Sequence, residues 1–300
     1  MTDSLLSCPC GLAPLRPFRL GRAGGLLRCQ RCGLLARAQT PSDEDVTKLY
    51  REDYWQWYRD EQVGAARRNV HEHALAWLEQ LMPRPGVLVD VGCGGGALLA
   101  SCRDRGWKGI GFDPSHQAAA YARARGLDVQ AEAFPPCSLA GATADAVTFI
   151  NVLDHLRDPF AALQEAWRVL RPGGLLYLRV PNGSFHASLL ALPAILRADR
   201  LAVFHLYGFS RSSLLHHLPR LGFQDVIVQT APPSQSDPYK QSGEGRELGR
   251  TILKGIDQMG FQLLQGLGLT RQAWGPSIEA MARKGGSGAK AIEAGRQGSR

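Results

Sequence analysis

The stretch GVLVDVGCGGGALLASCRDRG, residues 86–106, decides the fold of this chain. Its first residues form an apolar run of strand length around Asp90, and the glycines after it lead into a segment with helical spacing. A strand, a glycine-rich turn and a helix in this order let backbone N–H groups approach a ligand closely at a helix N-terminus. The glycine spacing alone leaves NAD and other nucleoside cofactors open, because Gly92, Gly94 and Ala97 also fit the dinucleotide fingerprint.

Apolar runs of strand length alternate with amphipathic stretches over residues 86–230. Repeated strand, helix, strand units predict an α/β fold with a doubly wound, mostly parallel Rossmann-like sheet that helices cover on both faces. One helix is expected over 159–170, with Pro159 at its first position. The expected strands cover 86–91, 109–113, 127–131, 145–151, 174–180 and 223–230, with a last one at 277–283.

This succession of motifs resembles class I S-adenosylmethionine-dependent methyltransferases. Their first motif, an acidic residue followed by G-x-G-x-G, matches Asp90-Val-Gly-Cys-Gly-Gly-Gly. The resemblance continues in order through the later strands and the helix that follows the fifth strand. The matching segments are GIGFDPS (109–115), QAEAF (130–134), FINVLDHLRDP (149–159), VLRPGGLLYLRVPN (169–182) and HLYGFSRSSLLHHLPRLGF (205–223).

The resemblance implies S-adenosylmethionine as the cofactor. In that family the acidic residue of the first motif, here Asp90, lies near the amino-acid part of the cofactor, and the glycines make room for its methionine and ribose portions. Asp113 is the expected acceptor for the two ribose hydroxyls, since a carboxylate accepts two hydrogen bonds from a diol. The segment after the third strand is expected near the adenine. The cofactor-binding residues expected in this way are Asp90, Gly92, Cys93, Gly94, Gly96, Asp113, Pro114, Glu132, Ala133, Phe134 and Asn151.

Methyl transfer from a sulfonium is an in-line displacement, so the protein must align the acceptor and exclude water. A hydroxyl or acidic-carbon acceptor also needs a general base, and the candidate catalytic residues are His155, His205 and Tyr207. The alternative for His155 is that it caps its loop or bonds a backbone carbonyl. We expect residues 87–210 to contain the whole catalytic machinery. The remaining histidines on helical stretches, where surface or packing roles are expected, are His71, His73, His216 and His217.

A helical lead-in is expected over 41–84, opening with the capping pattern Pro41-Ser42-Asp43-Glu44. Its aromatic cluster, which includes Tyr54, Trp55, Trp57 and Tyr58, forms either a lid over the acceptor or part of the core or a docking surface. Two apolar insertions are expected to be helices that pack on the domain and cover the substrate, or interfacial helices that give peripheral membrane contact. These insertions cover 185–204 and 247–268.

Four of the seven cysteines crowd near the N-terminus, in SCPCG (7–11) and RCQRCG (28–33). Clustered cysteines in a reducing compartment indicate metal ligands rather than disulfides. Cys29 and Cys32 fit a zinc knuckle, whereas Cys8 and Cys10 are one residue closer than the usual C-x-x-C spacing. Because four thiolates fill a tetrahedral site, a bound Zn²⁺ is expected to be structural; the alternative is a metal-free or degenerate ribbon. This N-terminus resembles that of zinc-ribbon methyltransferases associated with sugar and polysaccharide modification.

The sequence thus predicts four zones along the chain. They are a zinc ribbon at 1–40, the lead-in or lid at 41–84, a methyltransferase domain at 85–284 that contains both insertions, and a disordered tail at 285–300. Without a secretory leader pattern or a long apolar run, the cytoplasm is the expected location.

The net charge of +8 is located at the two ends of the chain. Residues 1–40 hold six arginines against one aspartate, and 283–300 hold five basic residues against one glutamate, so the body is close to neutral. We therefore expect a small-molecule acceptor, such as a sugar or another polar metabolite methylated on oxygen or carbon, rather than nucleic acid. The alternatives are an RNA methyltransferase that holds phosphates with the ribbon arginines, and a non-catalytic cofactor-binding scaffold. The sequence leaves the oligomeric state open.

Overall fold

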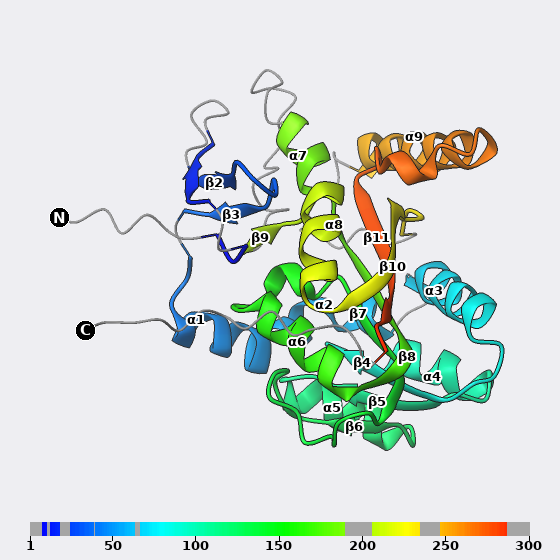
Figure 1. Ribbon diagram of the computed structural model, residues 1–300. Helices are drawn as coiled ribbons and strands as arrows, with labels where there is room; N and C mark the ends of the chain where they lie inside the picture. The colour runs from blue at the N-terminus through cyan, green and yellow to red at the C-terminus, as the bar shows by residue number, and fades with distance from the viewer. Residues whose placement is uncertain are drawn as a thin grey trace.

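A computed structural model of the chain describes residues 8–10, 13–18, 25–38, 40–63, 67–189, 206–234 and 247–286 (Figure 1). His205, most of the insertion at 185–204 and nearly all of the tail at 285–300 lie outside these described residues. Among the helices of the described part of the chain, none has the length and apolarity that a membrane span requires.

The centre of the fold is a seven-stranded sheet in the order β10-β11-β8-β7-β4-β5-β6. The neighbouring strands from β8 to β6 pair in parallel, and only β11 pairs antiparallel, with β8 on one side and β10 on the other. The expected mostly parallel sheet and its last strand are confirmed. The strands are β4 (Val87–Val91), β5 (Lys108–Phe112), β6 (Asp128–Gln130), β7 (Ala144–Ile150), β8 (Leu170–Pro181), β10 (Phe223–Thr230) and β11 (Ser277–Lys284).

Two apolar layers cover the two faces of this sheet. Alternate residues of β4 point to opposite faces: Val89 joins the layer that contains Phe160 and Leu214, and Leu88 joins the layer that contains Leu75. Helices of the first layer are α6 (Pro159–Val169) and α8 (Arg211–Arg220); those of the second are α3 (Arg68–Leu81), α4 (Ala97–Asp104) and α5 (His116–Ala124). Burial on both faces explains why the strands are almost continuously apolar.

The lead-in consists of α1 (Asp43–Lys48), η1 (Leu49–Asp53) and α2 (Tyr54–Val63), followed by α3. The expected capping pattern forms a capping box in which the Ser42 side chain accepts from the Asp45 N–H and Asp45 reaches back to the Ser42 backbone. In Figure 1 these helices lead from the cysteine-rich strands to the sheet. The lead-in therefore connects the cysteine-rich strands to the first strand of the large sheet.

The cysteine-rich segment forms a second sheet, in the order β1-β2-β3-β9. Its first three strands are β1 (Leu15–Pro17), β2 (Leu26–Cys29) and β3 (Leu35–Arg37). The fourth, β9 (Tyr207–Gly208), comes from the middle of the expected methyltransferase domain and pairs antiparallel with β3. We call β1–β3 with the four cysteines the ribbon. Its sheet is completed by a segment far away in the sequence.

Two further helices lie outside the sheet layers. The helix α7 (Gly183–Leu189) follows β8 directly, and α9 (Glu247–Gly266), which precedes the short η7 (Thr270–Gln272), lies across the top of the view in Figure 1. The helical pattern at 247–268 is thus present as a helix. Its described part exposes large apolar side chains. These are Met259 and Leu263 on α9, and Leu267 and Trp274 just beyond it. Membrane contact through this face stays a prediction.

Candidate functional site

A cavity of 410 Å³ opens at the carboxyl ends of β4, β5 and β7, where ligands bind in open α/β sheets. Ten of its lining residues were expected from the sequence: Asp90, Gly92, Cys93, Gly94, Asp113, Pro114, Ala133, Phe134, Asn151 and His155. The other polar lining residues come from the lead-in and from the loop after β7. They are Thr47, Tyr50, Arg51, Tyr54, Arg67, His71, Arg157 and Asp158. The cavity wall extends beyond residues 87–210, since η1, α2 and the start of α3 supply part of it; that these residues contain the whole catalytic machinery stays a prediction.

The glycine turn after β4 requires glycine for two different reasons. Gly92 and Gly94 have φ angles of 69° and 52°, in the left-handed region that favours glycine. A Cβ on Gly92 would also lie 2.4 Å from Cγ2 of Val152, the residue that follows β7 after Asn151. Gly96 has a different role, because its Cβ would lie 2.5 Å from Leu127 and it does not line the cavity.

Asp113 is held at the end of β5 by two backbone donors. The Gly94 N–H donates to its Oδ2 at 2.8 Å and the Ser115 N–H donates to its Oδ1 at 2.9 Å. Burial raises the pKa of the carboxyl, and these two hydrogen bonds oppose the rise. Each oxygen keeps a lone pair, so the fixed carboxylate can still accept two hydrogen bonds from a diol.

Asp90 is buried beneath the same turn. The Thr148 hydroxyl donates to its Oδ1 at 2.7 Å. Burial raises the pKa of Asp90 to about 7; the Thr148 hydrogen bond works against this rise and the nearby Asp113 charge adds to it. A cation brought into this part of the cavity would therefore favour loss of the Asp90 proton.

Arg67 and His71 face the cavity from the start of α3. They are four positions apart, so they lie on the same side of the helix. Burial lowers the pKa of His71 to about 4 and the charge of Arg67 acts in the same direction, so the imidazole is neutral near pH 7. His71 was expected to have a surface or packing role and instead lines the cavity. The i, i+4 spacing of two basic side chains at the start of the helix that precedes β4 was the available signal.

Phe134 and its neighbour Ala133 also line the cavity. The Phe134 ring packs edge-on against Phe112 and Phe149, with centroids 5.7 and 5.9 Å apart. Glu132, which the sequence placed near the adenine, is exposed to solvent and does not line the cavity.

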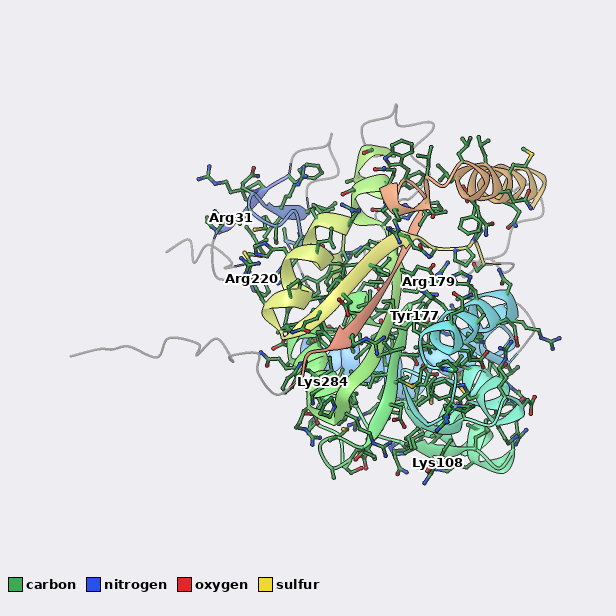
Figure 2. All side chains as sticks on the ribbon, turned by 45° about the vertical axis from the view of Figure 1, so that its right-hand side comes forward. Arg31, Lys108, Tyr177, Arg179, Arg220 and Lys284 are labelled. Carbon is green, nitrogen blue, oxygen red and sulfur yellow. The ribbon has the colours of Figure 1, made fainter. Side chains whose placement is uncertain are left out.

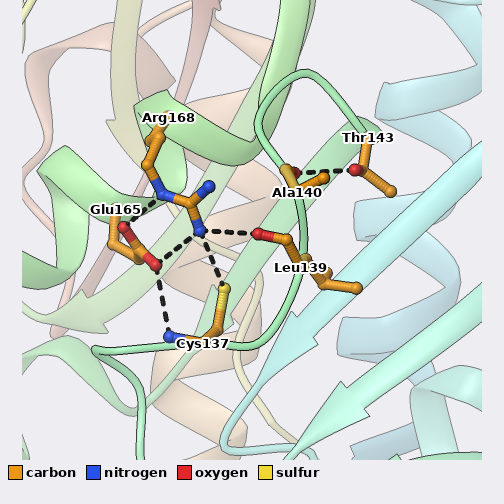
Figure 3. A network of polar contacts seen from close by, with 6 residues as sticks. All are labelled: Cys137, Leu139, Ala140, Thr143, Glu165 and Arg168. Carbon is orange, nitrogen blue, oxygen red and sulfur yellow. Dashed lines mark hydrogen bonds and ion pairs between the residues drawn. The ribbon is translucent and has the colours of Figure 1, made fainter.

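The loop that follows Phe134 is clamped onto α6 (Figure 3). Nη2 of Arg168 donates to the Leu139 carbonyl at 2.8 Å and to Glu165 at 2.7 Å, and the Cys137 N–H donates to the same Glu165 carboxylate at 3.2 Å. The Arg168 hydrogen bonds lower the pKa of Glu165 to about 2, so the clamp stays ionised at physiological pH. The clamp keeps the Phe134 wall in place.

His155 lies in the loop after β7, in the short helix η3 (Leu153–His155). Its Nδ1 contacts the hydroxyl of Tyr50, and its Nε2 lies 3.7 Å from Oδ2 of Asp154. Burial raises the pKa of Asp154 to about 7. The ring of Tyr54 lies at 6.5 Å from the imidazole, centroid to centroid, so aromatic faces surround His155. The sequence named His155 but missed Tyr50, which stands at the first position of the aromatic stretch.

Asn151 directs the chain from β7 into this loop. It has a φ angle of 55°, and its side-chain oxygen accepts from Nη1 of Arg179 at 2.5 Å. Arg179 is buried next to Tyr177 at the centre of the molecule, where Figure 2 shows both side chains on β8. A cation buried in β8 thus fixes a residue that lines the cavity.

Among the described residues, the remaining expected side chains do not line the cavity. Tyr207 donates its hydroxyl to the Arg157 carbonyl at 3.2 Å. Trp55 is buried against Tyr121, whereas Trp57 is exposed. The helical histidines other than His71 have packing roles or lie near the surface: His73 pairs with the buried Glu279 at 2.9 Å, His217 is buried, and His216 is half-buried beside it.

The four N-terminal cysteines converge to one point. Their sulfur atoms all lie within 4.8 Å of one another, with Cys8 and Cys32 3.6 Å apart and Cys10 and Cys29 also 3.6 Å apart. A tetrahedral zinc with Zn–S bonds of about 2.3 Å requires sulfurs about 3.8 Å apart, so the cluster fits this metal. Backbone N–H groups of Cys10 and Cys32 point at the sulfurs of Cys8 and Cys29, each at 3.5 Å. The short Cys8–Cys10 spacing does not keep these sulfurs apart.

Comparison with known proteins identifies the family of the chain and finds solved structures with the same fold. A sequence profile described as a methyltransferase domain matches residues 59–228, more than half of the chain. A ubiquinone biosynthesis O-methyltransferase of Rhizobium etli (strain CIAT 652) is 34% identical over 174 residues, which are 55% of this chain and 63% of that protein. The chain spans less than two thirds of the length of the curated relatives that head this comparison.

Two solved structures show how widely the fold is used. Burkholderia thailandensis 1,6-didemethyltoxoflavin-N1-methyltransferase with bound S-adenosylhomocysteine has a TM-score of 0.53 at 16% identity, over 90% of this chain and 99% of that chain. The cyclase SpnF has a TM-score of 0.50 at 20% identity, over 79% and 87% of the two chains. At these identities the likeness establishes the fold alone. The profile match and the ordered motifs around Asp90 and Asp113 go further, and the chain belongs to the class I S-adenosylmethionine-dependent methyltransferases.

Proposed function

We propose that the chain transfers a methyl group from S-adenosylmethionine to a hydroxyl oxygen of a small molecule. The observation that carries this proposal is one continuous cavity, with Asp90 and Asp113 at the glycine turn and the Tyr50–His155 pair in the same wall. When bound, S-adenosylmethionine supplies a methyl group on a positively charged sulfur. The chain then has to hold the cofactor, orient the acceptor and take up one proton.

Three parts of the cavity are suited to the cofactor. The Asp113 carboxylate, fixed by the Gly94 and Ser115 N–H groups, is suited to the ribose hydroxyls, and the Phe134 face to the adenine. Asp90 is suited to the ammonium of the methionine portion, and Arg67 to its carboxylate. Cys93 and Pro114 complete this wall through packing.

His155 is the proposed general base. The acceptor oxygen attacks the methyl carbon, the C–S bond breaks, S-adenosylhomocysteine leaves as the neutral thioether, and the hydroxyl proton passes to the imidazole. Asp154 lies 3.7 Å from Nε2 and its negative charge would stabilise the imidazolium. The Nδ1–H of His155 would donate to the Tyr50 oxygen, which holds the ring in the tautomer whose Nε2 is unprotonated and can accept the hydroxyl proton.

A hydroxylated ring is the proposed acceptor class. The Rhizobium etli relative is an O-methyltransferase by name, which supports oxygen as the acceptor atom. Tyr50 and Tyr54 present aromatic faces that suit the flat face of a phenol or the C–H face of a sugar. A cavity of 410 Å³ is in the range of small-molecule sites.

Zinc is the metal that we propose for the four-cysteine cluster. Its role would be structural, since the four cysteine sulfurs leave no open coordination position for chemistry. The three strands of the ribbon have only three, four and three residues, and a metal would supply much of the folding free energy of so small a sheet.

The test is a methyl-transfer assay with labelled S-adenosylmethionine and a panel of phenolic, sugar and nucleoside hydroxyl compounds, with transcribed RNA as a separate arm. Label in a phenol or sugar, with equimolar S-adenosylhomocysteine, supports the proposal. Label in RNA alone, or cofactor binding without transfer to any member of the panel, contradicts it. A matched His155→Gln sample shows whether the transfer depends on the proposed base.

A further inference from the structure

The short strand β9 lies between the ribbon and the catalytic loop. On one side it extends the ribbon sheet: Leu35 pairs with Gly208, Ala36 pairs with Tyr207, and the Arg37 N–H donates to the Leu206 carbonyl at 3.0 Å. These bonds connect the ribbon to residues about 170 positions later in the chain. They use backbone groups on both sides, so they depend on the course of the chain and not on particular side chains.

On its other side β9 holds the loop that carries His155. The Leu206 N–H donates to the Asp154 carbonyl at 2.9 Å, and the Tyr207 hydroxyl donates to the Arg157 carbonyl at 3.2 Å. Leu206 is buried, which shields its hydrogen bonds from water. The two contacts lie one residue before and two residues after His155. A displacement of β9 would therefore move the imidazole.

The cysteines fix the opposite end of this connection. Cys29 ends β2, and the turn that contains Cys32 leads directly into β3. The turn is packed against the start of α8: a Cβ on Gly33 would lie 2.9 Å from the Ser212 hydroxyl and 3.6 Å from the Ser210 hydroxyl. The four-cysteine cluster thus determines where β3 begins, and the pairing of β3 with β9 carries this constraint to β9.

The ribbon reaches the other member of the catalytic pair as well. The chain continues from β3 into α1 and η1, which carries Tyr50, and the Arg157 guanidinium contacts the Pro41 carbonyl ahead of α1. By contrast, Asp90 and Asp113 are built on β4 and β5, which pair only with strands of the large sheet. The two halves of the cavity therefore have different supports.

We propose that Leu206 and Tyr207 are positioning residues through which the cysteine ribbon holds the His155 loop at the acceptor end of the cavity, while cofactor binding is independent of the ribbon. The proposal rests on the proposed function for the role of His155. It predicts that damage to the cysteine cluster reduces acceptor turnover and leaves S-adenosylhomocysteine binding nearly unchanged.

The test compares the full chain with Cys29→Ser and Tyr207→Phe by hydrogen–deuterium exchange and by calorimetry with S-adenosylhomocysteine. In Cys29→Ser we expect faster exchange at 152–158 and 206–209, unchanged exchange at 87–112, and a cofactor Kd within about twofold of wild type. The kcat/KM for the acceptor should fall about 10- to 100-fold, the usual range when a residue that orients the site residues, without contacting the ligand, is replaced. These binding and exchange readouts do not need a known acceptor, so failure of the proposed function is distinguishable from failure of this inference.

Tyr207→Phe keeps the proposal testable if Cys29→Ser does not fold. It removes only the hydroxyl that donates to Arg157, so kcat/KM should fall about fivefold, as for one neutral hydrogen bond. Tyr121→Phe is the matched control, since the Tyr121 ring packs on Trp55 away from the cavity lining. The proposal would be overturned if Cys29→Ser showed faster hydrogen–deuterium exchange in the ribbon but wild-type exchange at 152–158. It would also be overturned if a folded Cys29→Ser lost cofactor affinity and turnover by the same factor.

Discussion

The hydroxyl of Tyr50 contacts Nδ1 of His155, across 105 positions of the sequence. The contact joins η1 of the lead-in to the loop after β7, and both residues line the cavity. Oδ2 of Asp154 lies 3.7 Å from the other ring nitrogen, so the imidazole has a polar neighbour on each side. This arrangement resembles that of a general base whose tautomer and orientation are set by its neighbours.

Replacing either member of this pair should reduce turnover without loss of cofactor binding. We expect His155→Gln to lower kcat by about 10²- to 10⁴-fold, the usual contribution of a general base. Tyr50→Phe should cost less, because the base remains and only its orientation is lost. Single-turnover rates with the acceptor found by the assay measure both effects, and S-adenosylhomocysteine titrations check binding. Equal turnover in His155→Gln and wild type would remove His155 as the base.

The parallel sheet and its glycine turn were predictable because their signals are local. The strand GVLVDV, the glycine-rich turn and the helix follow one another, and Asp90 and Asp113 each lie at the carboxyl end of a strand that the apolar pattern identifies. Burial on both faces makes such strands stand out in the sequence. The cofactor end of the cavity could thus be drawn largely from the order of motifs.

The part of the cavity around His155 could not be predicted from the sequence, because its contacts are between segments that are distant in the chain. The strand β9 has only two residues, too few for any periodicity, and its partner β3 lies near the start of the chain. Tyr50 belongs to an aromatic stretch in which several residues could equally have turned toward the site. Glu132 shows the converse error: it follows the third strand in the expected motif, but the loop turns its side chain to solvent.

Asp113→Asn should weaken S-adenosylmethionine binding. The amide keeps one acceptor oxygen but replaces the other with a donor, which opposes the N–H of either Gly94 or Ser115. We expect a loss of about 1.5–3 kcal/mol, as for hydrogen bonds to a charged group. Calorimetry with S-adenosylmethionine measures the loss, and Asp128→Asn, on the exposed side of β6, is the matched control. Unchanged affinity in Asp113→Asn would contradict the ribose assignment.

Cofactor affinity should rise with pH up to about 7 and then level off. The pKa of Asp90 is raised to about 7 by burial, so below this pH the side chain must lose a proton to meet the cofactor ammonium. Affinity should therefore increase about tenfold per pH unit on the acidic side, with release of one proton on binding. Calorimetry in buffers of different ionisation enthalpy counts that proton.

Two variants test whether Asp90 is the group responsible. Asp90→Asn should bind more weakly above pH 7 and lose the pH dependence. Thr148→Val removes the hydroxyl that donates to Asp90 and stabilises its charged form, so the level region should begin at a higher pH. A wild-type profile that is flat from pH 5.5 to 8, or one that persists in Asp90→Asn, would assign the proton elsewhere.

The purified protein should contain about one zinc per chain, bound by both cysteine pairs. Cys8 and Cys32 approach to 3.6 Å, as do Cys10 and Cys29, so each close contact joins one member of the first pair to one of the second. A single substitution in either pair therefore opens the whole cluster, and Cys29→Ser and Cys10→Ser should both lose the metal. Cys137→Ser, which alters a cysteine far from the cluster in the loop clamped by Arg168, should keep it. Metal analysis of the wild type and the three variants tests this prediction. Zinc that is retained in Cys10→Ser but lost in Cys29→Ser would mean that the short Cys8–Cys10 pair does not contribute both of its sulfurs. Wild-type protein that is folded and free of metal would contradict a zinc ribbon.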